Sequence, residues 1–246
     1  LARMLGIVFI IPLVYYALKK KLSKDLLISM SLIFVFGLFQ AVVGWWMVKS
    51  GLTDNPYVSS YRLAFHLANA LIIFGFLFWL SLSLFYGKNK NYYRSKLVKH
   101  LFHLSLILIF LTIITGSFMA GTDAGKSFNT FPLMNQQFIP EGYYLDKYGW
   151  KNTFENTIAI NFNHRWLAIF TFLFITSIVS YLLFSKKDKY NNFSLILVAI
   201  ILFIQICLGI LTLVYEVPIT YASIHQTNAV LLLAAMLFAY HRLIYK

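Results

Sequence analysis

Long apolar runs, separated by shorter polar connections, dominate the chain. Each run is about 20 residues long, the length that an α-helix needs to cross the hydrocarbon core of a bilayer. The runs cover residues 1–18, 26–48, 61–86, 97–119, 161–185, 192–215 and 221–243. The pattern predicts an all-α polytopic membrane protein with seven visible transmembrane helices. Its first run begins at Leu1, and we expect this run to be part of a longer segment.

Composition strengthens this prediction. Of the 246 residues, 60% are hydrophobic and only 12% are charged, whereas soluble domains carry about 25% charged residues. This composition excludes the usual classes of soluble enzyme and soluble binding domain. Cys207 is the only cysteine and lies within an apolar run, so we expect it to serve packing.

The net charge of +13 is distributed unevenly between alternate connections. Fourteen of the 21 basic residues lie on the side that carries connections 19–25, 87–96 and 186–191 and the C-terminus. The positive-inside rule places this side in the cytoplasm or its equivalent. The charge therefore indicates topology, and we expect no nucleic-acid partner.

The two halves of the chain repeat a pattern of polar and small residues. Its members are Gln40, Gly44, His66, Asn69 and Ala70 in the first half, and Gln205, Gly209, His225, Asn228 and Ala229 in the second. Such repeats are common in membrane proteins and often place a site in each half. The repeat predicts eight helices in two four-helix bundles. Residues 1–90 would form the first, lacking its first helix and a His-Arg pair ahead of Leu1, and residues 91–246 the second.

His66, His164 and His225 lie near the outer ends of their predicted helices. The two repeated histidines each share a helix face with an asparagine three residues later, Asn69 or Asn228. Packing or proton transfer is the ordinary role of a lone membrane histidine, but two imidazoles on facing helices can bind one metal. Zinc and copper need further donors that the sequence does not offer nearby, whereas haem iron needs only axial ligands. We therefore favour haem.

The stretch NFNHRWLAIF (161–170) places His164 and Arg165 at the start of a predicted helix, with Asn161 or Asn163 as its cap. Arg62 lies one turn before the first-half histidine. Haem propionates need a cationic partner, and arginine pairs well with carboxylates. Snorkelling at a helix end is the alternative for either arginine alone. Because both arginines lie beside the histidines, we interpret them as propionate-binding residues.

The other three histidines lie at the opposite, lysine-rich ends of the helices. They are His100, His103 and His241. We expect these side chains to lie near lipid headgroups without a partner on another helix.

Four segments, taken in order, resemble the haem A synthases, membrane enzymes that convert haem O to haem A for cytochrome oxidases. They are FQAVVGWWMVKSGL (39–52), GSFMAGTDAGKSFNTFPLM (116–134), ENTIAINFNHRWLA (155–168) and IQICLGILTL (204–213). The resemblance covers essentially the whole chain. The lack of an outer-loop cysteine pair resembles the mitochondrial and alphaproteobacterial branch of the family.

The resemblance implies two haem sites. A resident haem b would lie between His164 and His225, and the substrate haem would be bound by His66 and a histidine ahead of this chain. From their positions beside these histidines, we also expect haem-binding roles for Arg62, Asn69, Arg165 and Asn228. The candidate catalytic residues are His66 and Glu155, the latter chosen among the outer carboxylates because it belongs to a matching segment.

The implied reaction is the oxidation of one methyl group of haem O, through successive hydroxylations with water-derived oxygen, to a formyl group. The implied partners are a haem O synthase, an external electron acceptor, the lipid bilayer and further copies of the same chain. The implied location is the bacterial inner membrane, or the mitochondrial inner membrane in a eukaryote. A di-haem b-type electron carrier that uses the same histidines is the main alternative, and a transporter is a further one.

Overall fold

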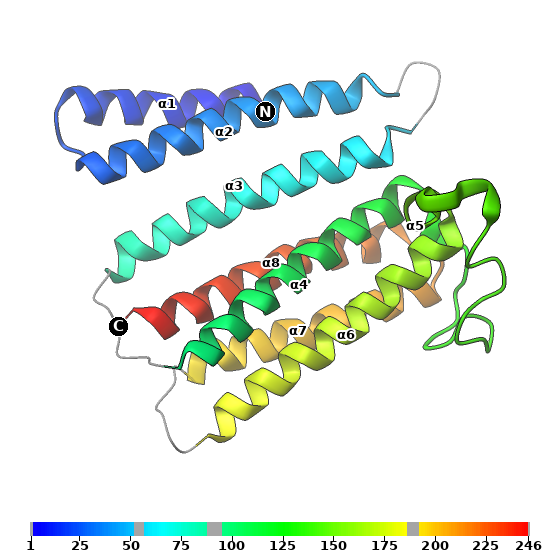
Figure 1. Cartoon of the computed structure of the whole chain (residues 1–246). Helices are drawn as coiled ribbons and strands as arrows, with labels where there is room; N and C mark the ends of the chain where they lie inside the picture. Colours follow the sequence, from blue (N-terminus) through cyan, green and yellow to red (C-terminus); the bar gives the residue numbers. More distant parts are fainter. Residues whose placement is uncertain (1, 52–56, 88–94, 186–191, 246) are drawn as a thin grey trace. The chain divides into compact units, whose positions relative to one another are not determined.

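A computed structural model of the chain describes residues 2–51, 57–87, 95–185 and 192–245. Seven apolar helices account for most of these residues (Figure 1). They are α1 (Ala2–Leu18), α2 (Lys24–Val48), α3 (Ser60–Tyr86), α4 (Lys96–Gly121), α6 (Thr157–Phe184), α7 (Asn192–Val214) and α8 (Ile219–Ile244). All of these except α1 are long and apolar enough to cross a membrane. The prediction of an all-α polytopic membrane protein is confirmed.

Polar caps define where several of these helices begin. The Ser23 side chain accepts a hydrogen bond from the Leu26 amide at the start of α2, and Ser95 accepts one from the Val98 amide at the start of α4. A serine oxygen at this position satisfies one of the amide groups that a first helical turn leaves without a partner.

Helix α6 begins earlier than the sequence pattern indicated, at Thr157 rather than at residue 161. Its cap is Asn156, whose side chain accepts a hydrogen bond from the Ile158 amide at 3.1 Å. The expectation that Asn161 or Asn163 caps this helix was therefore wrong. The additional turn places His164 and Arg165 inside a regular helix rather than at a frayed end, which fixes the direction of both side chains.

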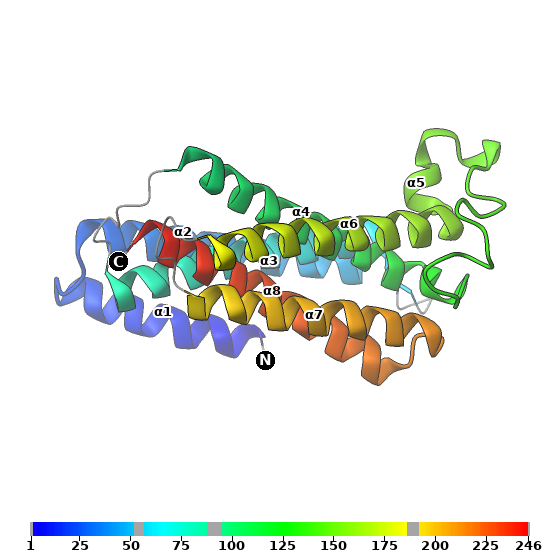
Figure 2. The same ribbon diagram turned by 90° about the horizontal axis from the view of Figure 1, so that it is seen from below.

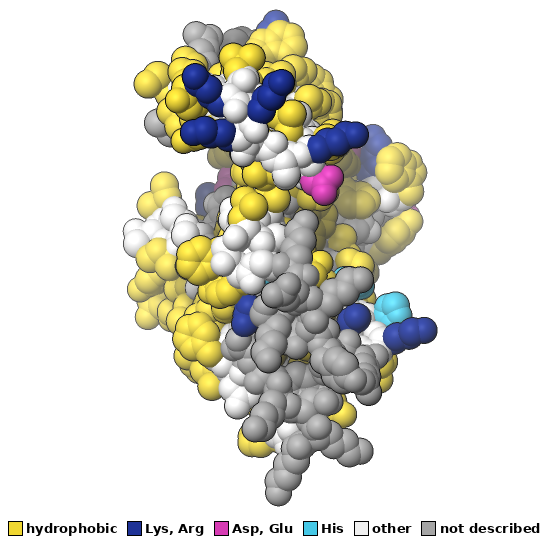
Figure 3. All heavy atoms as spheres, turned by 90° about the vertical axis from the view of Figure 1, so that its left-hand side faces the viewer, with side chains coloured by type: hydrophobic (Ala, Val, Ile, Leu, Met, Phe, Trp, Pro, Cys, Tyr) yellow, Lys and Arg dark blue, Asp and Glu magenta, His cyan; other side chains and the backbone are white. Residues whose placement is uncertain are grey.

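The outer surfaces of the helices are apolar. In the most apolar 18 residues of each helix, the share that is buried within the protein ranges from 11% in α2 to 50% in α8. Figure 3 shows hydrophobic side chains over the flanks of the helices, and basic side chains at the turn between α1 and α2. Large exposed apolar areas are rare in soluble monomers, and they match what lipid requires.

The chain forms two compact units, Leu1–Leu77 and Phe78–Lys246. The first unit contains α1, α2 and most of α3. Helix α1 packs on α2, while aromatic side chains join α2 to α3, including the edge-to-face pairs of Phe65 with Phe39 and Trp46. The division expected between residues 90 and 91 lies outside the described residues.

The second unit is a bundle of α4, α6, α7 and α8, which run alongside one another in both views of the ribbon (Figures 1 and 2). Helix α4 packs on α6 and α8, and α7 packs on the same two helices. Helices α6 and α8 therefore occupy diagonal corners, with their inward faces directed across the bundle. Bundle cores of this kind are common sites for cofactors.

A long connection, residues 122–156, joins α4 to α6 at one end of this bundle (Figure 1). It contains the short helices η1 (Ala124–Lys126), η2 (Asp146–Lys151) and α5 (Asn152–Glu155). Asn156 donates hydrogen bonds to the carbonyl of Gly142 and to the side chain of Asn152. The connection is thus fastened to the start of α6, close to the turn that carries His164.

Candidate functional site

His164 of α6 and His225 of α8 lie on the diagonal helices of the second unit. The structure thus brings together two of the three histidines that the sequence singled out, on opposite sides of one bundle. Two facing imidazoles are the arrangement that a metal with two axial positions requires.

A glycine of a neighbouring helix lies against each of these imidazole rings. A Cβ atom at Gly116 of α4 would lie 3.3 Å from Cε1 of His164, and one at Gly209 of α7 would lie 3.0 Å from Cε1 of His225. Any larger residue would push the ring away from its position. The two glycines therefore set how closely the rings approach the helices beside them. The sequence marked Gly209 only as a member of the repeat and Gly116 only as the first residue of a segment that resembles the family.

A hydroxyl group holds the His164 ring. Oγ1 of Thr115 lies 2.8 Å from Nδ1 of His164 and 2.9 Å from the carbonyl oxygen of Thr112. The sequence pattern gave Thr115 no role, although it lies directly before the segment 116–134, one of the four that resemble the family.

An amide pair holds the His225 ring. Nε2 of Gln205 lies 3.2 Å from Nδ1 of His225, and Asn228 donates a hydrogen bond to Oε1 of Gln205 at 2.8 Å. Asn228 is buried, with 7% of its surface exposed. Asn228 thus acts on His225 through Gln205. Among the described residues, it forms no hydrogen bond with the ring itself.

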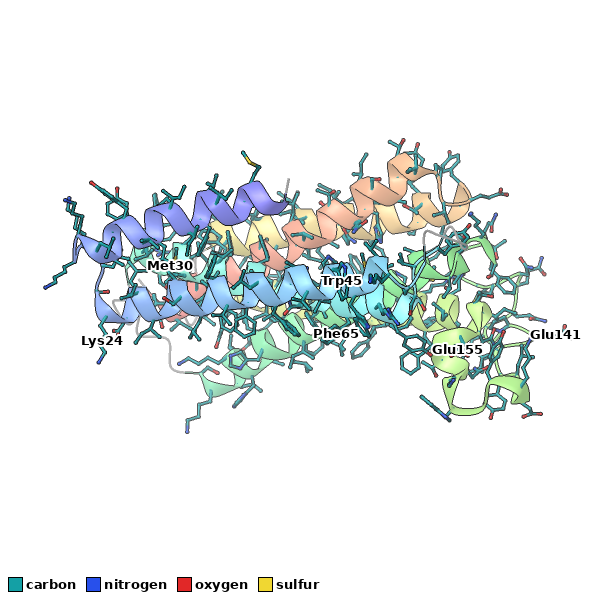
Figure 4. The ribbon with its side chains drawn as sticks, turned by 90° about the horizontal axis from the view of Figure 1, so that it is seen from above. Lys24, Met30, Trp45, Phe65, Glu141 and Glu155 are labelled. Carbon is teal, nitrogen blue, oxygen red and sulfur yellow. The ribbon has the colours of Figure 1, made fainter. Side chains whose placement is uncertain are left out.

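The first unit repeats this arrangement around His66. Nε2 of Gln40 lies 3.3 Å from Nε2 of His66, and Asn69 donates a hydrogen bond to Oε1 of Gln40 at 2.6 Å. A Cβ atom at Gly44 would lie 2.9 Å from Cε1 of His66. Figure 4 shows this end of α2, which carries Trp45, beside Phe65 of α3.

Arg165 is buried, with 6% of its surface exposed. Its side chain binds residues 128–133 of the long connection. Its terminal nitrogens donate to the side chain of Asn161 and to the backbone carbonyls of Phe128, Thr130, Pro132 and Leu133. The shortest of these bonds, to Thr130, is 2.7 Å. Among the described residues, Nε of Arg165 is a buried donor without a partner. The loop and Asn161 are bound by the two terminal nitrogens, so the single N–H of Nε remains for a further acceptor.

Arg62 has a different environment. It donates to the carbonyl of Trp46 at 2.8 Å, and its guanidinium lies over the Trp46 ring, 4.5 Å from the centroid. These contacts hold a partly exposed cation at the end of the first unit, near the turn that carries His66.

Glu155 lies in α5 of the long connection, where it pairs with Lys151 at 3.7 Å. Figure 4 shows Glu141 and Glu155 on this connection and not among the bundle helices. A cavity of about 390 Å³ lies in the same region, lined by Phe128, Asn135, Gln137, Glu141 and Gly142. None of the residues that the sequence singled out for a role lines it.

The expectation for the inner histidines was wrong in two cases. The Tyr240 hydroxyl of α8 forms a hydrogen bond with Nε2 of His103, and His241 is completely buried, with Ser83 at 3.4 Å from its Nε2. For His103 the reason is that α4 and α8 pack directly on each other. For His241 the partner comes from the end of α3, which lies beside α8 at Ser83.

Within the described ranges, no group of three or more His, Cys, Asp or Glu side chains could hold a metal ion. A zinc or copper centre built from protein ligands alone is therefore not supported there, since such centres use more than two protein donors. The paired histidines instead suit a group that brings its own equatorial ligands.

Comparison with known proteins identifies the family. The family of cytochrome oxidase assembly proteins matches residues 1–237. A protein of Flavobacterium psychrophilum named heme A synthase is 38% identical over 250 residues, which is 98% of this chain and 71% of that protein. Heme A synthases of Wolbachia pipientis from Culex pipiens and of Nitrosospira multiformis are 39% and 37% identical, covering 97% and 99% of this chain and 70% and 69% of their own lengths.

These relatives match nearly all of this chain, and the family match over residues 1–237 includes the segments that carry the paired histidines. They give no support to the di-haem electron carrier that uses the same ligands. The chain belongs to the haem A synthase family of cytochrome oxidase assembly proteins.

Proposed function

We propose that this chain oxidises a methyl group of haem O to the formyl group of haem A, with the reacting haem bound at His66 and a resident haem b bound at His164 and His225. The observation that carries the proposal is the pair of histidines on the diagonal helices α6 and α8, each with its ring against a glycine of a neighbouring helix. Family membership supplies the substrate, since the relatives are named heme A synthases.

Haem fits the residues of the second unit. Gly116 and Gly209 leave each imidazole room against the neighbouring helix, and the unpartnered Nε of Arg165 offers a buried N–H. A propionate accepts such a hydrogen bond and carries the charge that a guanidinium needs. A haem b bound there would supply a one-electron redox centre within the membrane. We propose that Arg165 serves both the loop and this propionate, and that Arg62 serves a propionate of the substrate haem.

The reaction on the substrate balances without a cofactor that carries oxygen. Each hydroxylation adds the oxygen of one water to the methyl carbon and releases two protons and two electrons. The second hydroxylation gives a gem-diol, which loses water to leave the formyl group. The electrons must pass to an external acceptor, because the chain shows no flavin or nicotinamide motif. Glu155 is our candidate for accepting a proton from the outer side of this reaction.

We also propose the membrane and the partners. The bacterial relatives favour the bacterial inner membrane, with the basic connections facing the cytoplasm. A haem O synthase would deliver the substrate directly through the lipid, because haem O carries a long hydrocarbon tail. Assembly into a homo-oligomer is compatible with the exposed apolar flanks of the helices.

Haem extraction tests this function. The gene is expressed in a bacterial host that makes haem O but has no haem A synthase of its own, and the haems are separated by chromatography. A formylated haem is the expected product. Accumulation of unchanged haem O beside a haem-loaded protein would mean that the chain binds haem without oxidising it, and would overturn the proposal.

A further inference from the structure

The three histidines differ in the hydrogen bonds that their rings make, and this difference has a chemical consequence. A neutral imidazole has one N–H and one lone pair, on different nitrogens. Iron must bind the nitrogen with the lone pair. A neighbour that accepts a hydrogen bond from the ring therefore leaves the lone pair for iron, whereas a neighbour that donates one competes with iron for it.

The neighbour of His164 accepts. The Thr115 hydroxyl lies within hydrogen-bond distance of the Thr112 carbonyl and of Nδ1 of His164. We assign the single hydroxyl proton of Thr115 to the bond with the Thr112 carbonyl, which can only accept, because this bond to the preceding turn is the usual one for a helical threonine. The hydroxyl oxygen must then accept from the ring, which places the proton on Nδ1 and the lone pair on Nε2. This is the tautomer in which histidine ligands are usually fixed by their outer partners.

The neighbour of His225 donates. Asn228 donates to the backbone carbonyl of Ile201 at 3.1 Å, and because that carbonyl only accepts, the orientation of the Asn228 amide is fixed. The same amide nitrogen donates to Oε1 of Gln205. The nitrogen of the Gln205 amide, which can only donate, must then face the His225 ring, 3.2 Å from Nδ1 and 3.5 Å from Nε2. Whichever ring nitrogen accepts, the one lone pair of the ring is used.

In the first unit an amide N–H also faces the histidine ring, but a different hydrogen bond sets the orientation of the glutamine. Gln40 donates to the backbone carbonyl of His66 at 3.1 Å, which fixes its amide nitrogen on the side of the histidine. Its Oε1 accepts from Asn69. The amide nitrogen lies 3.3 Å from Nε2 of His66, so an N–H donor again covers the lone pair. The other ring nitrogen, Nδ1, is buried without a hydrogen-bond partner among the described residues.

We propose that Gln40 and Gln205 are positioning residues that direct an amide N–H at the lone pairs of His66 and His225, and so make these two histidines weaker and more readily exchanged iron ligands than His164. This inference rests on the proposed function, in which the three histidines bind haem iron. Asn69 and Asn228 set the direction of the two glutamines, which explains why glutamine, histidine and asparagine recur together in both halves.

The arrangement suits a site whose occupant must leave. When a product haem departs from His66, the ring regains the Gln40 hydrogen bond, so the lost iron bond is partly offset. In the second unit, the same device makes the two ligands of one haem unequal: His164 is the firm ligand and His225 the labile one.

Substitutions of Gln205 test the inference, because they change the polarity of one hydrogen bond. Gln205→Glu has the same shape and still accepts from Asn228, but it presents an acceptor to the ring, which would move the proton to the facing nitrogen and free the lone pair of the other. We expect the transfer of haem from the purified protein to excess apomyoglobin to slow about tenfold, since one hydrogen bond is worth roughly a factor of ten. We also expect a more negative midpoint potential.

Two further variants separate polarity from packing. Gln205→Met removes the donor without adding a charge, and we expect slower haem transfer than in the unchanged protein. Thr115→Val removes the acceptor of His164, and we expect faster transfer. A purely structural role for Gln205 predicts faster haem loss for any substitution. The inference is overturned if Gln205→Glu and Gln205→Met both release haem as fast as, or faster than, the unchanged protein. If Gln205→Glu does not fold, Gln205→Met decides the question alone.

The unchanged protein separates this inference from the function beneath it. If it contains no haem, or if His225→Ala leaves the bound haem unaltered, the assignment of the haem ligands is wrong. If His225→Ala alters the haem but the Gln205 variants do not slow its transfer, the ligands stand and only the role of the glutamines is wrong.

Discussion

Replacing His66 with alanine is expected to reduce haem A formation by about a hundredfold or more while the protein keeps its haem b. The His66 ring is fixed by Gln40 and lies against Gly44, so its loss leaves the substrate haem without the group that positions it. Misplacement of a reacting group by about 1 Å can cost on the order of a hundredfold in rate. The resident haem is unaffected because its proposed ligands belong to α6 and α8.

The measurement is the ratio of haem A to haem O in membranes that contain equal amounts of each variant. His100→Ala is the control, since His100 is an exposed histidine of α4 for which we propose no role. It should leave the ratio unchanged. Retention of half the activity or more by His66→Ala would show that His66 does not hold the substrate.

Replacing Arg165 with methionine is expected to have the largest effect on stability. The buried guanidinium donates to four loop carbonyls and to Asn161, and its removal leaves several of these acceptors without a partner. Removing a buried charged donor and leaving its acceptors unpaired lowers the free energy of unfolding by about 3–5 kcal/mol. Because the bonds converge on residues 128–133, we expect the long connection to detach before the bundle unfolds.

Limited proteolysis and thermal unfolding of the purified variants measure these effects. Arg165→Met should be cut within residues 122–145 much faster than the unchanged protein. Arg62→Met is a matched control, because Arg62 also lies near a histidine but is partly exposed, and in the described part of the chain it donates a hydrogen bond to the Trp46 carbonyl. It should cost less than about 1 kcal/mol. Equal protease resistance in the Arg165 variant would contradict the role of this residue as the anchor of the loop.

The sequence predicted the helices well because their length and apolar character are properties of single segments. Each of the seven expected runs corresponds to a helix, with ends that differ by a few residues. The main error was at α6, where the pattern of apolar residues begins after the helix does. The first turn, from Thr157 onwards, packs under a folded connection rather than in lipid, so hydropathy could not indicate it.

The candidate site was only partly predictable. The repeat pointed to the histidines and to Gln40 and Gln205, because repeated polar residues in lipid-facing segments stand out. Thr115 and Gly116 have no counterpart in the visible first half, so nothing in the pattern marked them. Their roles depend on α4 packing beside α6, which is a property of the folded bundle.

The arginines illustrate a different limit. A sequence shows that a cation lies at a helix end, but it does not show what its nitrogens contact. Arg165 binds backbone carbonyls of a loop, and backbone groups carry no sequence signal at all. The sequence could therefore not predict that Arg165 anchors the loop. The proposed contact with a propionate is now limited to one nitrogen, Nε of Arg165.

The central claim is that His164 and His225 are the two ligands of one haem, and the reduced-minus-oxidised absorption spectrum of the purified protein tests it most directly. We predict a low-spin, six-coordinate haem b in the unchanged protein and in His66→Ala. His164→Ala and His225→Ala should each lose the low-spin spectrum or the haem itself, with His164→Ala the more severe. A low-spin haem b that survives in His225→Ala and disappears in His66→Ala would contradict the claim.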